Sequence, residues 1–523
     1  MYPIFSQSEK VTVTEQYFTM PDGIKLYTRI MVPKGLTKAP IVFIRTPYEA
    51  AHNSTPHDIA SCESNPYIRN GYAVVLQHVR GRGDSEGVCV PYNERDDGLN
   101  TLNIIRQLDI YDGSIYIYGG SYLSTAHLCY LDTNPKDIKA AVLNIQTDRM
   151  YFRNYRNGCC YSFCNLHWYL SMISRSYPNP NMEEAFKRPY KDIMRRVIGE
   201  DYPPYTNLLL NDQYNHFWQN APQAHAIDAL KIPVLFAEGW YDFYLEGMFS
   251  MWQRLPEATK EKSTMIVGPW GHDTAISTQA EYPLENGNIP ADFVVEWFNS
   301  IRDRKRYPYA KLGQVNYYTI GNDTWKTSPY PTAPAKEMEL YFSQQQALST
   351  TPSKTQQSIS YTYDPEKRLG CYKYSNIYKA ADIGSVEGVT SFLSQEFGEE
   401  TSFFGKIRWK MDVSSDCDDT AFFIRVYFVE GETAYNLTET ITSLSHIKAD
   451  YQAGEKLTID LYTPPIAFTV KKGGRIRVDI SSDGGIYVPH ANKKEHWASV
   501  TETKVATNTI YLKDSFITLP FEP

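Results

Sequence analysis

The feature that constrains this chain most is the stretch at residues 114–132, where a β-rich apolar run stops abruptly at a pair of glycines. The run covers residues 115–118, and Ser121 directly follows Gly119 and Gly120. The next ten residues carry leucines mostly on one face of a helix. A strand, a sharp turn and a helix are therefore expected to meet at Ser121, with small neighbours that leave room for its side chain.

A serine on a strand-to-helix turn of this kind is the pattern of the nucleophile elbow of α/β-hydrolases. The final glycine of the usual G-x-S-x-G pattern is absent here, since the residues read Gly119-Gly120-Ser121-Tyr122-Leu123. The competing interpretation is an ordinary Gly-rich turn in a doubly wound sheet, in which Ser121 only caps the following helix. The rest of the chain has to supply the context for either interpretation.

Residues 36–145 alternate between apolar runs typical of buried strands and helical patterns, which predicts a mostly parallel sheet. Residues 146–230 break this pattern, because they are rich in aromatics, Asn and Cys. We interpret them as an inserted helical cap, with helical segments expected near 160–175, 182–198 and 212–220. The sheet is expected to resume at 232–237 and 264–267 and to close with a helix at about 290–302.

From about residue 306, short strands rich in Tyr, Phe, Thr and Val recur between turn signals, and the first of them is expected at 315–320. This pattern of short strands and turns predicts an antiparallel β-sandwich of the jelly-roll type. The predicted architecture is α/β: an α/β-hydrolase domain in two parts, a helical cap and a C-terminal jelly roll. The boundaries expected for these units are 1–145 and 231–305 for the hydrolase domain, 146–230 for the cap and 306–523 for the jelly roll.

Composition narrows the function classes. The net charge of −8 argues against a nucleic-acid partner, and the chain contains no run of 18 apolar residues. The first ten residues lack a basic start and an apolar core, so we expect a cytoplasmic protein with no membrane partner. Eight scattered cysteines suggest reduced thiols. Cys160, Cys164 and His167 resemble metal ligands, but no second ligand pair has zinc-site spacing, so we expect core cysteines, no metal and no cofactor.

A serine nucleophile needs a base, and the base needs an orienting acid. In α/β-hydrolases the acid and then the histidine follow the serine along the chain, each near the end of a strand. Asp242 follows the expected strand at 234–237, and His272 follows the strand at 265–267. Glu238 and Glu246 compete with Asp242 for the role of acid. Asp242 could instead cap a helix, and His272 could be a polar loop residue.

The same chemistry needs hydrogen-bond donors for the developing oxyanion. The backbone N–H of Tyr122, directly after the serine, is one candidate. The second donor should come from the loop after the strand that ends near Ile44, where Tyr48 stands with a hydroxyl able to donate. The alternative for Tyr48 is a packing aromatic after a proline turn.

Five short motifs stand in order along the chain: Arg45-Thr46-Pro47-Tyr48, Val79-Arg80-Gly81-Arg82-Gly83-Asp84-Ser85-Glu86-Gly87, Gly119-Gly120-Ser121-Tyr122, Gly239-Trp240-Tyr241-Asp242 and Gly268-Pro269-Trp270-Gly271-His272. In these motifs the chain resembles the cocaine-esterase-like (CocE/NonD) hydrolases, a group related to X-prolyl dipeptidyl peptidases and α-amino-acid ester hydrolases. The resemblance covers nearly the whole chain, including the cap and the jelly roll.

This resemblance implies that Ser121 is the nucleophile, His272 the base and Asp242 the acid that orients it. It also implies that the Tyr48 hydroxyl and the Tyr122 amide form the oxyanion hole. The implied activity is a serine hydrolase that cleaves an ester or amide bond of a small acyl substrate through an acyl-enzyme.

The resemblance further implies a substrate pocket between the cap, the sheet domain and the jelly roll. Trp168 is expected as a wall residue, although it could be an ordinary aromatic of the cap core, and Phe243 and Tyr244 are expected to bind substrate as well. Two residues depart from the family pattern, because His78 replaces the usual Asp and Ser124 replaces the usual Gly. Neither departure removes a catalytic group, so activity is expected.

Alternatives remain open at this stage. An Xaa-Pro dipeptidyl peptidase would need an acidic group for the substrate amine, and the sequence identifies none. An α-amino-acid ester hydrolase or acyltransferase is a further alternative. A protein of another class would use the jelly roll for binding and carry a degenerate hydrolase site. A homodimer is also open, because sandwich faces and cap helices can both pair.

Overall fold

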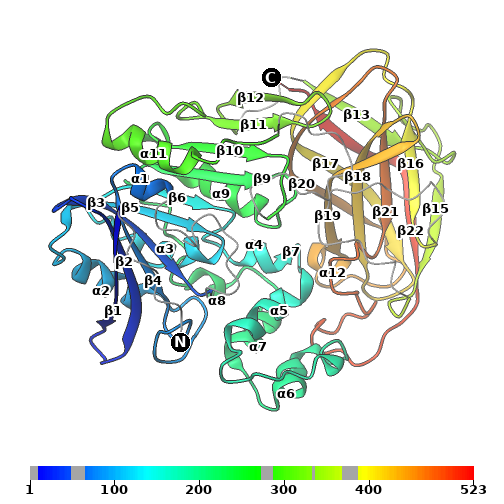
Figure 1. Ribbon diagram of the computed structural model, residues 1–523. Helices are drawn as coiled ribbons and strands as arrows, with labels where there is room; N and C mark the ends of the chain where they lie inside the picture. The colour runs from blue at the N-terminus through cyan, green and yellow to red at the C-terminus, as the bar shows by residue number, and fades with distance from the viewer. Residues whose placement is uncertain (1–9, 49–64, 273–286, 332–335, 368–386, 523) are drawn as a thin grey trace.

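The computed structural model describes residues 10–48, 65–272, 287–331, 336–367 and 387–522 of the chain. Two large β-sheets dominate the described residues, and a group of helices lies beside both of them (Figure 1). Each sheet has ten strands: the first belongs to an α/β-hydrolase domain, and the second forms a C-terminal β-sandwich of the jelly-roll type.

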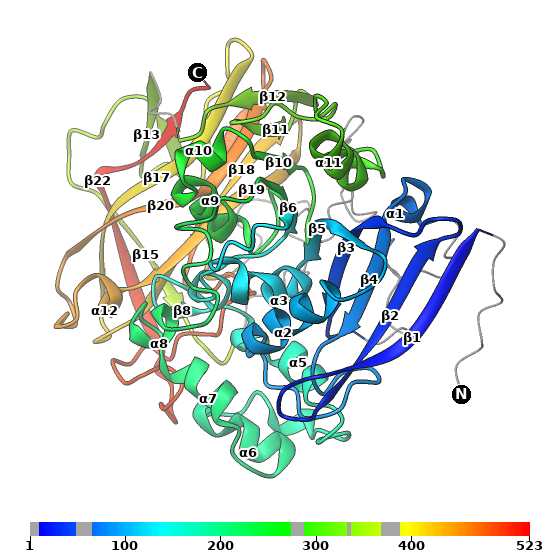
Figure 2. The same cartoon turned by 90° about the vertical axis from the view of Figure 1, so that its left-hand side faces the viewer.

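The first sheet is parallel in its centre and antiparallel at its edges. Its strands, in spatial order, are β1 (Val11–Thr19), β2 (Lys25–Pro33), β4 (Ala73–His78), β3 (Ala39–Thr46), β5 (Tyr111–Gly120), β6 (Ile138–Asn144), β9 (Val234–Gly239), β10 (Thr264–Gly268), β11 (Val315–Thr319) and β12 (Thr324–Ser328). Strands β5 and β6 lie at its middle, so the turn after β5 lies at the centre of the end of the sheet where the parallel strands terminate. The β1–β2 hairpin closes the outer edge (Figure 2).

Helices cover both faces of this sheet, as the apolar strands require. One face packs against α2 (Arg95–Ile105), α3 (Tyr122–Leu131) and α9 (Leu245–Arg254), and the other against α1 (Pro66–Arg69) and α11 (Phe293–Arg302). Because side chains alternate along a strand, Phe43 enters the first of these layers and its neighbour Val42 the second. The short helix α10 (Glu257–Lys260) precedes β10.

The cap between β6 and β9 consists of short elements with their own buried cluster. They are α4 (Tyr151–Asn154), β7 (Tyr155–Arg156), β8 (Cys159–Cys160), α5 (Ser162–Met172), the 3-10 turns η2 (Met182–Glu184) and η3 (Tyr190–Asp192), α6 (Ile193–Ile198), α7 (Pro203–Leu210) and α8 (His216–Gln219). The same cluster includes Tyr244 from the hydrolase domain and Val488 and Ala498 from the C-terminal part. The cap is therefore packed against both neighbours.

The second sheet is antiparallel except for one pair, β14 with β16. Its strands are β13 (Glu337–Phe342), β14 (Ala347–Ser349), β15 (Ser358–Tyr363), β16 (Thr390–Ser394), β17 (Thr401–Ser415), β18 (Ala421–Glu430), β19 (Thr433–Ser443), β20 (Leu457–Val470), β21 (Arg475–Ser481) and β22 (Ala506–Pro520), with the short helix α12 (Leu444–Ile447) after β19. Buried Phe, Ile and Trp side chains such as Phe403 and Trp409 form its core.

The strand expected at 315–320 is present, but its expected placement in the sandwich is wrong. Strand β11 pairs in parallel with β10, with Met265 opposite Val315, and β12 then pairs with β11. Both strands therefore extend the first sheet. The error has a physical cause, because a β-like pattern identifies a strand without identifying the sheet that accepts it.

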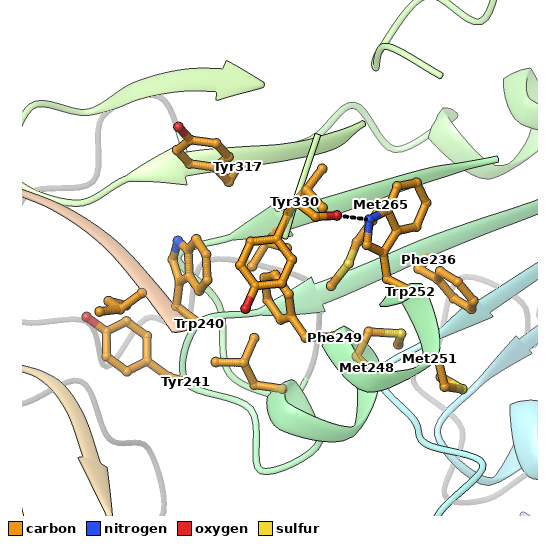
Figure 3. Close-up of a cluster of buried hydrophobic side chains, with 14 of the residues drawn as sticks. Phe236, Trp240, Tyr241, Met248, Phe249, Met251, Trp252, Met265, Tyr317 and Tyr330 are labelled. Carbon is orange, nitrogen blue, oxygen red and sulfur yellow. Dashed lines mark hydrogen bonds between the residues drawn. The ribbon is translucent and has the colours of Figure 1, made fainter. Parts of the chain in front are cut away.

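The end of β9 is anchored from two directions by buried aromatic residues (Figure 3). The indole N–H of Trp240 donates to the carbonyl oxygen of Tyr318 at 2.7 Å, and the Tyr241 hydroxyl donates to the carbonyl oxygen of Asn436 at 3.0 Å. Asn436 belongs to β19, so the jelly roll contacts the turn that leads to Asp242. This contact fixes the position of that carboxylate relative to the sheet.

Among the described residues, the longest apolar helices fall short of what a membrane span requires.

Candidate active site

Ser121 lies on a strained turn between β5 and α3. Its backbone has φ 54° and ψ −129°, a conformation that is rare for a residue with a side chain, and α3 begins at the next residue, Tyr122. A Cβ atom on Gly119 would lie 2.5 Å from the Cα and N atoms of Ser124, so glycine is required there. These are the features of a nucleophile elbow, in which the serine side chain is exposed above the sheet.

The structure brings Ser121, His272 and Asp242 together. The Nε2 atom of His272 is 2.9 Å from the Ser121 Oγ, and its Nδ1 atom is 2.7 Å from the Asp242 Oδ2. The imidazole is about a third exposed while the Asp242 side chain is completely buried. This arrangement can pass a proton from the serine to the histidine and hold the ring in one orientation by its other nitrogen.

Of the three carboxylates considered for the acid, only Asp242 contacts the histidine in the described part of the chain. Its Oδ1 also accepts the backbone N–H of Tyr244 at 2.8 Å, which fixes its rotamer. Glu246 lies 3.4 Å from Arg156 in an ion pair. Glu238 is buried at the end of β9, where its Oε1 accepts the N–H of Gly239 at 2.8 Å.

Tyr48 lies close to the serine, as an oxyanion donor would. Its hydroxyl is within hydrogen-bonding reach of Ser121, and the Trp168 indole N–H donates to it at 3.4 Å. Burial raises the pKa of Tyr48, so its hydroxyl keeps its proton at neutral pH and can donate. The N–H of Tyr122 belongs to the first turn of α3 and has no partner within the helix, so it is open to an oxyanion.

A cavity of about 210 Å³ opens onto Ser121 and His272. The three residues expected to bind substrate, Trp168, Phe243 and Tyr244, all line it. The Phe243 ring stacks on the imidazole with 4.5 Å between ring centroids. The described lining is aromatic and carries no carboxylate or ammonium group.

Two lining residues, Tyr92 and Asn165, were missed by the sequence analysis. Tyr92 has a φ of 71°, and its N–H donates to the Tyr122 hydroxyl at 2.8 Å. Asn165 ends a left-handed turn at the start of α5, in which Ser162, Phe163 and Cys164 also have positive φ angles. Neither residue belongs to a motif, and the sequence carries no signal for these backbone conformations.

The two departures from the family pattern are accommodated locally. The Ser124 side chain is buried below the elbow, and its hydroxyl donates to the carbonyl oxygen of Asn144 at 3.2 Å. His78 ends β4, and its Nδ1 accepts the N–H of Asp84 at 3.2 Å. Neither side chain lines the cavity at Ser121.

Six of the eight cysteines lie among the described residues, and all six are buried free thiols. Cys62 and Cys371 lie outside the described residues. The sulfur atoms of Cys160 and Cys164 are 3.4 Å apart, which is well beyond a disulfide bond. The described parts of the chain contain no group of three or more His, Cys, Asp or Glu side chains that could hold a metal ion.

Two family models match the chain. Residues 22–274 match the X-Pro dipeptidyl-peptidase (S15 family), and residues 309–516 match the X-Pro dipeptidyl-peptidase C-terminal non-catalytic domain. A curated relative, a cocaine esterase from Rhodococcus sp. (strain MB1 Bresler), is 22% identical over 524 residues, which cover 88% of this chain and 89% of the relative.

Solved structures show the same fold. An aminopeptidase from the marine sediment archaeon Thaumarchaeota archaeon superposes with a TM-score of 0.81 at 18% identity, covering 98% of this chain and 96% of the other. An α-amino acid ester hydrolase superposes with a TM-score of 0.81 at 18% identity over the full length of both chains.

The fold and the matched families together define a class, that of serine hydrolases acting on ester or amide bonds. Within this class, the chain belongs to the CocE/NonD-like hydrolases of the X-Pro dipeptidyl-peptidase (S15) family.

Proposed function

We propose that this chain is a carboxylic-ester hydrolase that forms an acyl-enzyme on Ser121. The observation that carries the proposal is the continuous hydrogen-bonded relay from Ser121 through His272 to Asp242, with distances of 2.9 and 2.7 Å. A hydroxyl, an imidazole and a buried carboxylate in this order are what acyl transfer through a serine requires.

In the first half of the proposed reaction, Ser121 gives its proton to His272 Nε2, and its Oγ attacks the carbonyl carbon of the ester. The negative charge on the carbonyl oxygen is stabilised by the Tyr48 hydroxyl and the Tyr122 N–H. The protonated imidazole then gives its proton to the leaving alcohol as the carbon–oxygen bond breaks. In the second half, His272 takes a proton from water as the water oxygen attacks the acyl carbon. The imidazolium then returns that proton to the Ser121 Oγ as the acyl–Oγ bond breaks, which releases the acid and restores Ser121.

The lining of the cavity favours an uncharged acyl group. Tyr92, Trp168, Phe243 and Tyr244 present aromatic surface, and Asn165 presents a neutral amide. A substrate ammonium would be desolvated against the described lining without a carboxylate to pair with, which is costly. The lining thus supports an acyl esterase over an Xaa-Pro dipeptidyl peptidase or an α-amino-acid ester hydrolase.

The test compares p-nitrophenyl esters of acetate, butyrate and benzoate with a phenylglycine ester and an Ala-Pro p-nitroanilide, using Ser121→Ala as the control. We expect the uncharged esters to have the highest kcat/KM and Ser121→Ala to show no turnover. Faster cleavage of the Ala-Pro anilide would contradict the ester assignment. Ligand binding without turnover of any of these substrates would favour the binding-protein alternative.

A further inference from the structure

Glu238 is a buried carboxyl group that the proposed reaction does not use. It lies at the end of β9, four residues before Asp242, and its side chain has no exposure to solvent. One oxygen, Oε1, accepts the Gly239 N–H at 2.8 Å. The other, Oε2, is buried and has no hydrogen-bond donor among the described residues. If Glu238 were ionised, burying a carboxylate oxygen without a hydrogen-bond donor would cost a large amount of free energy.

The side chain of Asp242 lies within hydrogen-bonding reach of Glu238. Asp242 already accepts two hydrogen bonds, from the Tyr244 N–H at 2.8 Å and from His272 Nδ1 at 2.7 Å. Two adjacent carboxyl groups in a buried site cannot both be ionised, because like charges repel and neither is solvated. Asp242 is the member that faces the imidazole, so the charge belongs on it and the shared proton belongs on Glu238.

We propose that Glu238 is a positioning residue: its Oε2–H donates a hydrogen bond to the Asp242 carboxylate and holds that carboxylate against His272. The relay of the proposed function then has four members, Glu238, Asp242, His272 and Ser121. This inference rests on the proposed function and adds a residue that fixes the charge and orientation of its acid. Burial and the nearby Asp242 charge raise the pKa of Glu238 well above its ordinary value, in agreement with a neutral side chain.

One buried cation lies near the pair: Arg153 of α4 lines a cavity together with Asp242, and its guanidinium lies 4.0 Å from the centroid of the Phe243 ring. On one side of β9, strand β10 places Val267 opposite Glu238, and His272 follows the end of that strand. On the other side, the Asn144 amide of β6 accepts the Ala237 N–H at 3.0 Å. Helix α9 contributes two charged side chains, and both are paired: Glu246 with Arg156 and Arg254 with Asp148.

The first test is the pH profile of kcat/KM for Glu238→Leu and Glu238→Gln. Loss of the donated hydrogen bond makes Asp242 a stronger partner for the imidazolium, so Glu238→Leu should move the acidic limb of the profile up by about one pH unit. Glu238→Gln keeps a donor in the same place and should return the limb to its wild-type position. Glu246→Gln, in the following helix, is the matched control and should leave the limb unchanged.

The second test needs no turnover. The infrared difference spectrum of wild type minus Glu238→Gln at pH 7 should contain the carbonyl stretch of a protonated carboxylic acid, shifted in D2O. A difference spectrum with only carboxylate bands would overturn the proposal, as would an unmoved acidic limb in Glu238→Leu.

Fluorophosphonate labelling of Ser121 distinguishes a failure of the Glu238 proposal from a failure of the proposed function. Suppose that wild type and the Glu238 variants are all labelled, but that the acidic limb of the pH profile does not move and the protonated-acid band is absent. The proposed role of Glu238 is then wrong, and the serine hydrolase assignment stands. If wild type is not labelled, both the relay and the fourth member fail.

Discussion

The Nε of Arg82 donates a hydrogen bond of 2.8 Å to the carbonyl oxygen of Pro47, the residue directly before Tyr48. The same guanidinium donates through Nη1 to the carbonyl oxygen of Ser171 in α5 at 2.9 Å. One side chain therefore joins the segment that carries Tyr48 to the cap helix that carries Trp168. The arginine holds together two walls of the cavity at the serine.

Replacing Arg82 by Met should lower kcat by about tenfold or more, because a displacement of a catalytic group by about 1 Å is enough for losses up to about 10²-fold. The matched control is Arg80→Met. Arg80 pairs with Asp97 at 2.7 Å and with Asp22 at 2.7 Å, away from the cavity. The Arg80→Met variant should have a slightly lower thermal midpoint than wild type and a kcat near that of wild type. Equal kcat losses in both variants would contradict the link to Tyr48.

Tyr48→Phe should lower kcat by about 10²–10³-fold, the loss typical of one oxyanion donor, with the fold unchanged. The reason is that the hydroxyl of the half-buried Tyr48 is within reach of Ser121 and stays protonated. Steady-state kinetics on a neutral ester measures the effect. Tyr92→Phe, which alters a second tyrosine of the same cavity, should keep a kcat close to wild type. An unchanged kcat in Tyr48→Phe would remove this residue from the oxyanion hole.

Gly119→Ala should be poorly folded, because its new Cβ would lie 2.5 Å from the backbone of Ser124. Overpacking of this kind costs about 1–3 kcal/mol or more, since backbone atoms cannot move aside as a flexible side chain can. Gly120→Ala is the control, because its Cβ would meet nothing closer than the Tyr118 hydroxyl at 3.6 Å. Thermal unfolding and soluble yield should separate the two variants, and similar midpoints would contradict the packing at the elbow.

Asp148 should make stability depend on pH. This carboxyl lies where the chain enters the cap, 2.5 Å from the Arg254 guanidinium, and burial raises its pKa from 3.8 to about 6. A carboxyl whose pKa is higher in the folded chain than in the unfolded chain costs stability as the pH rises between those two values. The gap between 3.8 and about 6 corresponds to about 3 kcal/mol.

The corresponding variant is Asp148→Asn, which cannot ionise. Its thermal midpoint minus that of wild type should therefore become more positive between pH 4 and 7, whatever the offset at pH 4. The slope with pH is the prediction, because loss of the Arg254 ion pair changes the offset as well. A midpoint difference that is constant or falls over this range would contradict the raised pKa.

Much of the hydrolase domain could be predicted from sequence because its strands are buried on both faces and read as uninterrupted apolar runs. Polar residues that end such runs gather at one edge of the sheet. Ser121, Asp242 and His272 were identified for this reason, and the structure brings their side chains within hydrogen-bonding distance of one another. The turn at the glycine pair could also be predicted from the sequence, since few other residues fit such a turn.

Other features could not be predicted, for physical reasons. The β11–β12 hairpin joins the first sheet through pairing with β10, which a pattern of alternating residues does not encode. Tyr92 and Asn165 enter the cavity from backbone conformations with positive φ, which depend on the packing of the cap. The fixed position of Asp242 depends on a contact between Tyr241 and Asn436, residues that lie 195 positions apart.

The most direct test of the account is the intact mass of the protein after treatment with a fluorophosphonate. Only a serine activated by a neighbouring base reacts readily with this reagent. We predict one adduct per chain on wild type, located on Ser121, none on Ser121→Ala and strongly slowed labelling of His272→Ala. An unlabelled wild type, or an adduct that persists on Ser121→Ala, would contradict the assignment of Ser121 as the nucleophile.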